Sequence, residues 1–129
     1  MKLRIRDNSV RFRLERGEVD TLRDESRVAA STCFAEGIEF VYAVESDAGC
    51  NSPAAVFAAN AIVVRLPAAA VRKWADSEQV SIEGAQVAPD NSTLAILVEK
   101  DFACLAPREG EDESDMFPHP QADDPSVSC

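Results

Sequence analysis

The segment KLRIRDNSVRFRL, residues 2–14, contains two runs in which apolar and basic residues alternate. Alternation with a period of two is typical of β-strands, because successive side chains point to opposite faces of a sheet. Asp7 and Asn8 separate the two runs, and both residue types tolerate the left-handed backbone that a two-residue hairpin loop requires. The segment therefore predicts a β-hairpin with one apolar face and one basic face.

The two-residue loop also predicts the register of this hairpin, with Ile5 opposite Val10 and Arg4 opposite Arg11. A three-residue loop would mix apolar and basic side chains on one face, which a half-buried sheet does not tolerate. Like charges directly across a strand pair are destabilising, by up to about 1 kcal/mol for each pair. We therefore expect an anionic group to lie over the basic face. The basic face consists of Lys2, Arg4, Arg6, Arg11 and Arg13.

The anion over the basic face could come from the chain itself or from outside it. Internal candidates are carboxylates on other strands and the acidic C-terminal segment. The supporting carboxylates selected from the sequence are Glu39, Glu45 and Glu99, with Glu83 as a further candidate. The external candidate is a phosphate-containing ligand or an acidic peptide, bound by the planar guanidinium groups. The sequence leaves both sources open.

Hydrophobic periodicity predicts two helices and five further strands after the hairpin. The expected helices are 15–25 and 67–75, and the expected strands are 27–34, 38–45, the end of 54–66, 80–83 and 93–100. This order predicts one α+β domain over residues 1–105, built on a single, mostly antiparallel, half-barrel-like curved sheet with two short helices. Residues 106–129 form an acidic, Pro-rich segment that we expect to be partly mobile, because it has few apolar groups to offset ordering entropy.

Charge and hydropathy limit the partners. The 129 residues carry a formal net charge of −10, which disfavours non-specific binding to nucleic acid or to an anionic membrane. No apolar run is long enough to predict a membrane helix, and the N-terminus lacks the apolar stretch of a signal peptide. These features predict a cytoplasmic protein, in which Cys33 and Cys104, inside apolar runs, would be reduced core residues.

Catalytic and metal-binding patterns are weak. The single histidine, His119, lies between two prolines in the acidic segment, and no glycine-rich phosphate loop is present. The four cysteines lack the short spacing that tetrahedral zinc sites show. The sequence therefore predicts no catalytic residue, no metal site and no cofactor, and favours a non-enzymatic role.

Two segments resemble those of an uncharacterised family of short bacterial proteins. The first is residues 1–14, which match the pattern M-K-[IL]-R-I-R-x-N-S-[IV]-R-x-R-L, and the second is the E-K-D-F-x-C-L match at residues 99–105. The resemblance carries no assigned activity and therefore implies no catalytic residue. It does imply that the region from Arg108 to Pro120 belongs to the pattern of the domain.

Three functional hypotheses follow. The preferred one is a small binding or interaction module that binds an anion through the basic face. The second is a protein-interaction adaptor that acts through its acidic segment. The third is a metal-dependent phosphohydrolase that acts on polyphosphate or a nucleotide with the basic face and Glu99; it requires several more carboxylates to converge on the arginines.

Overall fold

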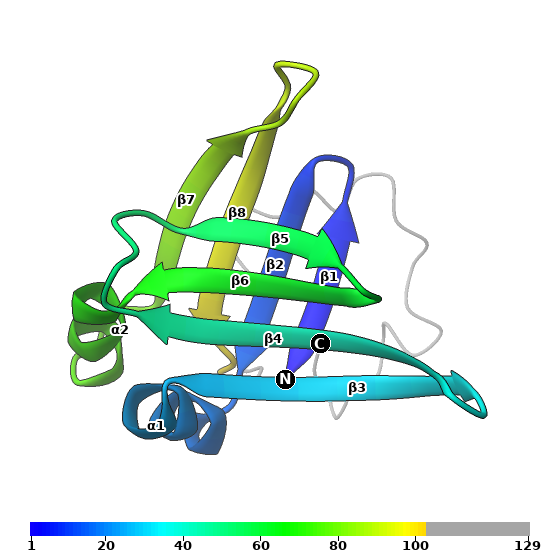
Figure 1. Cartoon of the computed structure of the whole chain (residues 1–129). Coiled ribbons are helices and arrows are strands. Elements are labelled where there is room, and N and C mark those ends of the chain that lie inside the picture. Colours follow the sequence, from blue (N-terminus) through cyan, green and yellow to red (C-terminus); the bar gives the residue numbers. More distant parts are fainter. Residues whose placement is uncertain (103–129) are drawn as a thin grey trace, which may run out of the picture.

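Two four-stranded sheets and two helices make up the part of the chain that the computed structural model describes, residues 1–102 (Figure 1). Sheet A consists, in order, of β1 (Lys2–Arg6), β2 (Ser9–Leu14), β8 (Thr93–Lys100) and β7 (Ser81–Val87). Sheet B consists, in order, of β3 (Arg27–Ala35), β4 (Ile38–Asp47), β6 (Ala61–Pro67) and β5 (Ala54–Ala58). The helices are α1 (Arg16–Glu25) and α2 (Ala68–Ala75). Expectations for residues 106–129 lie outside the described residues.

Each sheet is mixed, and the two together do not form the single, mostly antiparallel sheet expected from the sequence. Within each sheet, two antiparallel hairpins lie next to each other, and their inner strands pair in parallel: β2 with β8, and β4 with β6. The helices carry the chain between the sheets, since α1 follows β2 and α2 follows β6. The prediction of β-strands with two short helices is confirmed, and the described part of the predicted α+β domain is mostly β. The prediction of one curved sheet is wrong because the parallel pairings join segments far apart in the sequence.

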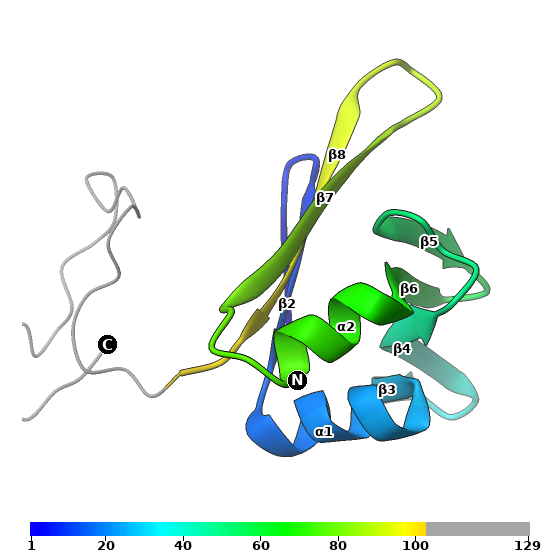
Figure 2. The same cartoon turned by 90° about the vertical axis from the view of Figure 1, so that its left-hand side faces the viewer.

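The core lies between the two sheets, whose strands cross at a steep angle (Figures 1 and 2). Phe12 and Leu14 of β2 and Val98 of β8 face Val44 and Val64 of sheet B, and all five side chains are fully buried. Alternation explains this packing, because every second residue of each inner strand is apolar and points between the sheets. The two helices pack against each other beside the ends of the sheets (Figure 2). Neither of the helices within residues 1–102 could span a membrane.

The N-terminal hairpin has the predicted register. Leu3 pairs with Phe12, Arg4 with Arg11 and Ile5 with Val10. Asp7 adopts a positive φ of 48°, as the two-residue loop requires. The apolar face of β2 is buried, and its other face points away from the core.

Three expectations away from this hairpin are corrected. Residues 54–66 form two strands instead of one, joined by Ala59 and Asn60, whose φ angles are 51° and 60°. Alanine is uncommon in this conformation, so the sequence did not indicate the turn. Cys33 is exposed rather than buried, because it lies on an edge strand that extends beyond the core. The apolar run 94–98 also predicts a strand buried on both faces, but only Ile96 and Val98 on the inner face of this run are buried, and Ala95 on the outer face is exposed.

A side-chain contact joins the two sheets where β5 meets β7. The Gln86 side chain accepts a hydrogen bond from the Ala55 N–H and donates one to the Ala55 carbonyl, each at 2.9 Å. The amide of Gln86 therefore bonds to β5 much as a neighbouring strand would. Nearby, Gly84 faces the ring of Pro53, and a Cβ built on Gly84 would lie 2.7 Å from two ring carbons.

Gly84→Ala is expected to lower the free energy of unfolding by about 1 to 3 kcal/mol, because the added methyl group overpacks this contact. Gly17→Ala is the matched control, since a Cβ there meets nothing within 4 Å. Because Gly17 lies in α1, that change should stabilise by up to about 1 kcal/mol. Urea denaturation of both variants tests the contact. Equal stability of Gly84→Ala and the unsubstituted chain would contradict it.

The basic face of sheet A as the candidate functional site

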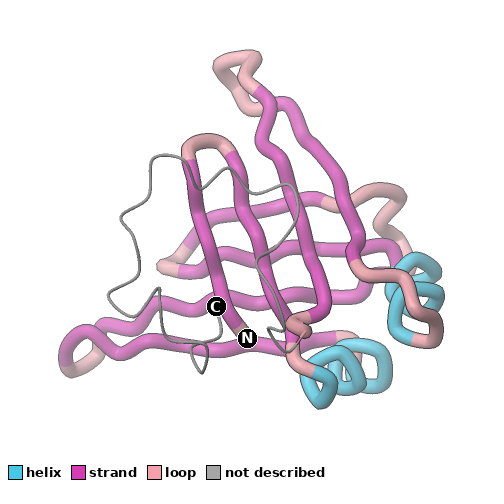
Figure 3. Tube along the Cα trace, turned by 180° about the vertical axis from the view of Figure 1, so that it is seen from behind, coloured by secondary structure: helices cyan, strands magenta, loops and turns pink. Residues whose placement is uncertain are grey.

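The basic face lies on the outer surface of sheet A, the sheet nearest the viewer in Figure 3. The register places Arg4 opposite Arg11 and Lys2 opposite Arg13, so the cations of the two strands lie side by side. Their neighbours along β2, including Phe12, point into the core. The five predicted residues are thus brought together on one face, and the burial of the opposite face fixes their orientation.

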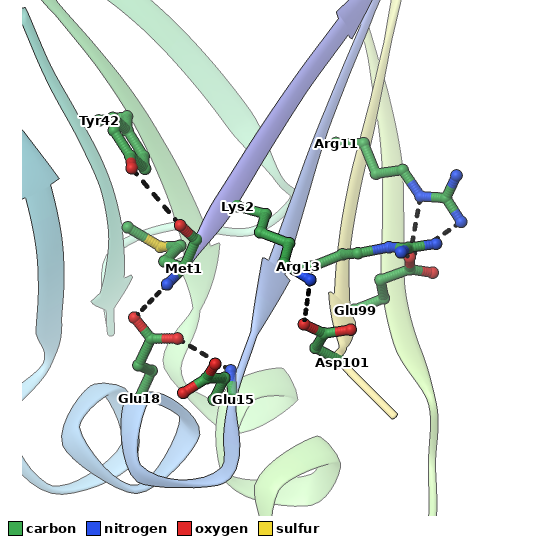
Figure 4. Close-up of polar contacts among 9 residues, drawn as sticks. All are labelled: Met1, Lys2, Arg11, Arg13, Glu15, Glu18, Tyr42, Glu99 and Asp101. Carbon is green, nitrogen blue, oxygen red and sulfur yellow. Dashed lines mark hydrogen bonds and ion pairs between the residues drawn. The ribbon is translucent and has the colours of Figure 1, made fainter. Parts of the chain in front are cut away.

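Glu99 binds two of these arginines. Its Oε1 atom accepts a hydrogen bond of 2.9 Å from Nε of Arg11 and one of 2.7 Å from Nε of Arg13 (Figure 4). Nη2 of Arg11 also lies 2.9 Å from the same oxygen. Glu99 is 8% exposed and is the one charged residue that is buried within residues 1–102. This carboxylate therefore neutralises part of the basic face and orients two guanidinium groups.

The parallel pairing of β2 with β8 brings Glu99 to this position. The pairing sets Arg13 directly opposite Glu99, with Arg11 two residues away on the same face of β2. Of Glu39, Glu45 and Glu99, Glu99 alone reaches the basic face. Glu39 and Glu45 both lie on β4, in the other sheet.

Glu45 has an equivalent role on sheet B. Its two carboxylate oxygens accept hydrogen bonds from Arg27 Nε at 3.1 Å and from Arg65 Nε at 3.2 Å. These two arginine side chains are about half exposed (51% and 52%), whereas those of Arg11 and Arg13 are 24% and 21% exposed. The same two-arginine motif is therefore exposed on one sheet and largely buried on the other.

The remaining cations of the basic face are more open. Lys2 Nζ lies 3.1 Å from Oδ2 of Asp101, a residue that the sequence analysis did not select (Figure 4). Arg4 and Arg6 are exposed, and neither side chain has an ion pair or hydrogen bond within residues 1–102. The open part of the basic face is defined here as Arg4 and Arg6. Nothing in their local sequence distinguished them from the other three cations.

The open part belongs to a face with a positive surplus. By alternation and register, five cations share the outer face of sheet A with Glu83 and Glu99, and Asp101 lies just beyond β8. The cations thus outnumber the acids on a chain whose net charge is −10. A positively charged face on a negatively charged chain attracts anions and disfavours the binding of cations at this face.

The N-terminal end of the hairpin is held by a second polar cluster. The Met1 amino group lies 2.6 Å from Oε2 of Glu18, and Oε1 of Glu18 accepts the Glu15 N–H, which caps the start of α1 (Figure 4). The Tyr42 hydroxyl donates to the Met1 carbonyl at 3.4 Å. These contacts fix β1 against α1 and sheet B, so the cations of β1 project from an anchored strand.

Other electrostatic features lie away from the basic face. The hydrogen bond from Arg23 lowers the pKa of Asp24, and hydrogen bonds from Ser92 lower the pKa of Asp90. Both carboxylates are exposed, on α1 and in the β7–β8 loop respectively. Within residues 1–102, no group of three or more His, Cys, Asp or Glu side chains could hold a metal ion. The convergence of carboxylates that the phosphohydrolase hypothesis requires does not occur in this part of the chain.

The fold and the site together define an open, two-sheet, mostly β domain with a cationic surface on one outer sheet face. The chain belongs to the family of unknown function DUF7009, whose model matches residues 1–121. This match confirms the resemblance to an uncharacterised family. No curated protein and no solved structure matches the chain. Family membership assigns no activity, so functional conclusions depend on the site itself.

Proposed function

We propose that this protein is a small binding module that binds a phosphate-containing anion on the basic face, with Arg4 and Arg6 as the main ligands. The observation that carries the proposal is the exposure of these two arginines, without a partner in residues 1–102, beside a largely buried arginine pair that shares Glu99. Arginine suits this role because its planar, permanently charged guanidinium group can donate two parallel hydrogen bonds to phosphate oxygens.

The geometry favours a ligand with several charged oxygens, such as a polyphosphate, and is less suited to a ligand with one carboxylate group. Arg4 and Arg6 are two residues apart on β1, so their Cα atoms are separated by about 6 to 7 Å. Arg4 is also directly opposite Arg11, whose guanidinium group is held by Glu99. An extended polyanion could contact Arg4 and Arg6 together, and it would relieve the repulsion between Arg4 and Arg11.

The other two hypotheses gain less support. The adaptor hypothesis depends on the acidic segment, which lies outside the described residues. The phosphohydrolase hypothesis needs several carboxylates around the arginines, and within residues 1–102 no group of three or more such side chains could hold a metal ion. The proposal is therefore for binding, and it assigns no reaction.

Inorganic tripolyphosphate, titrated at low salt by calorimetry, tests this proposal. We expect the full chain to bind tripolyphosphate. The double variant Arg4→Gln/Arg6→Gln should bind it at least about tenfold more weakly, which corresponds to a loss of about 1.4 kcal/mol in binding free energy. Binding should weaken as salt rises, because exposed charges are screened.

The control is Arg27→Gln/Arg65→Gln, which makes the same change in net charge on the outer face of sheet B. This variant should bind tripolyphosphate as well as the unsubstituted chain does. Absence of binding to the unsubstituted chain, or equal losses in the two double variants, would refute a site on the basic face.

A further inference from the structure

The four sheet edges of this molecule differ in how they are protected. An unprotected edge presents unpaired backbone N–H and C=O groups to other chains, and proteins commonly block such edges with charges, short strands or side-chain caps. Edge strand β1 carries Lys2, Arg4 and Arg6, and edge strand β7 carries Glu83. Edge strand β5 has five residues, and the Gln86 amide bonds to its backbone at Ala55.

Edge strand β3 lacks these protections from Ala29 to Cys33, although α1 contacts β3 and its pairing with β4 is irregular between Cys33 and Ala35. From Val28 to Ala35, eight consecutive residues include no charge, no proline and no glycine. Residues 31–35 are all exposed, and this half of β3 extends past the neighbouring sheet (Figures 1 and 3). Phe34 and Ile38, at the tip of the β3–β4 hairpin, are 72% and 56% exposed. Of the four edges, β3 is therefore the one suited to pair with another strand.

The hydrogen-bond pattern identifies which residues of β3 face outward. The Val41 N–H donates to the Asn60 carbonyl, on the β6 side of β4. Ser31 is the partner of Val41 across the β3–β4 pair. In antiparallel pairs, residues bonded to the neighbour alternate with residues that point away from it. Ser31 accordingly directs its N–H and C=O to the open edge, and Ala29 and Cys33 do so by the same alternation.

We infer that β3 pairs antiparallel with β3 of a second copy of this chain, about a two-fold axis at Ser31, which joins two four-stranded B sheets. When the axis passes through a residue, core-facing side chains of one copy lie opposite core-facing side chains of the other. Both sets then lie on the same face of the joined sheet, because side chains alternate with a period of two. Ala29 of each copy then lies opposite Cys33 of the other. The arrangement closes on itself, as stable homodimers do.

Charge complementarity favours a second copy in this orientation. Arg27 begins β3 and Glu36 follows its last residue, so the two ends of the edge have opposite charge. Antiparallel pairing about Ser31 brings the Arg27 end of one copy toward the Glu36 end of the other, beyond the irregularity between Cys33 and Ala35. Parallel pairing would place like charges together at both ends, which is destabilising. This inference does not depend on anion binding, because β3 and the basic face lie on different sheets.

Sedimentation of the full chain over low to high micromolar concentrations tests the pairing. We expect the mass to rise toward twice the 14.0 kDa of one chain. Association should strengthen as salt rises, because each copy has a net charge of −10 and the copies repel at long range. This dependence on salt is opposite to that expected for anion binding.

Two variants locate the interface. Ser31→Lys places two cations at the axis and should raise the dimer dissociation constant at least about tenfold, or about 1.4 kcal/mol. Ser31→Pro should have a similar effect without adding charge, since it removes only an N–H that points to the open edge. Val87→Lys, at an exposed position of β7, is the control and should dimerise normally. Circular dichroism verifies that each variant is folded.

Three results would overturn the inference. The first is an unsubstituted chain that stays monomeric at every concentration. The second is a dimer that both Ser31 variants leave unchanged, which would place the interface elsewhere. The third is a monomeric chain whose β3 edge binds an unrelated extended peptide, which would make the partner a different protein.

Discussion

Glu99→Ala is expected to lower the free energy of unfolding by about 2 to 4 kcal/mol, because it leaves two largely buried arginines without the carboxylate that they share. Arg11 and Arg13 both bond to Oε1 of Glu99 and are 24% and 21% exposed. Because both arginines are partly exposed, we expect a smaller loss of unfolding free energy than for a fully buried ion pair. Chemical denaturation at low salt measures the loss, and it should shrink as added salt screens the repulsion between the arginines.

Glu45→Ala is the matched control for Glu99→Ala. Glu45 also bridges two arginines, but those side chains are about half exposed and on the other sheet. Its loss should cost at most about 1 kcal/mol, as for other surface ion pairs. Glu99→Ala should also bind tripolyphosphate more tightly than the unsubstituted chain, because two more guanidinium groups become available. Equal stability losses in the two variants would show that the burial of Glu99 has no energetic consequence.

Trp74→Ala is expected to lower the free energy of unfolding by about 3 to 5 kcal/mol. Trp74 is fully buried in α2, and its indole N–H donates to the Val80 carbonyl at 2.9 Å. The Lys100 ammonium group lies 5.8 Å from the ring centroid. The side chain thus joins α2 to the segment before β7 and to the end of β8, and its removal leaves a large cavity at this junction.

Trp74→Phe separates packing from hydrogen bonding at the same position. Phenylalanine retains most of the buried ring, and the Val80 carbonyl keeps its second donor, the Lys100 N–H at 3.0 Å. We expect a loss of about 1 kcal/mol for the missing indole hydrogen bond, in addition to a smaller packing cost. Urea denaturation followed by circular dichroism measures both variants. If Trp74→Ala destabilised the protein less than Trp74→Phe does, this role of the indole ring would be contradicted.

Patterns within short stretches of the sequence predicted the N-terminal hairpin and the two helices, which depend mainly on interactions between nearby residues. The alternation in residues 2–14 predicted the hairpin, its register and its basic face. The apolar spacing in residues 15–25 and 67–75 predicted two helices close to the observed α1 and α2. In these segments, side-chain periodicity and turn chemistry are sufficient, because each partner lies within a few residues.

Non-local pairing was the part that the sequence did not predict. The parallel pairs β2–β8 and β4–β6 each join two hairpins into a separate sheet, so the strands form two sheets instead of the expected one. Periodicity contains no information about which distant strands pair. For the same reason, the sequence could not distinguish Glu99 from Glu39 and Glu45 as the carboxylate beside the arginines. It also did not identify Asp101 as the partner of Lys2.

Nuclear magnetic resonance of the arginine Nε–Hε groups during a titration with tripolyphosphate tests the proposed anion site most directly. The proposed function predicts that the Arg4 and Arg6 signals shift progressively and saturate, while those of Arg27 and Arg65 on the opposite sheet stay in place. Signals of Arg4 and Arg6 that do not move, or shifts of similar size in all four arginines, would contradict a specific anion site on this face.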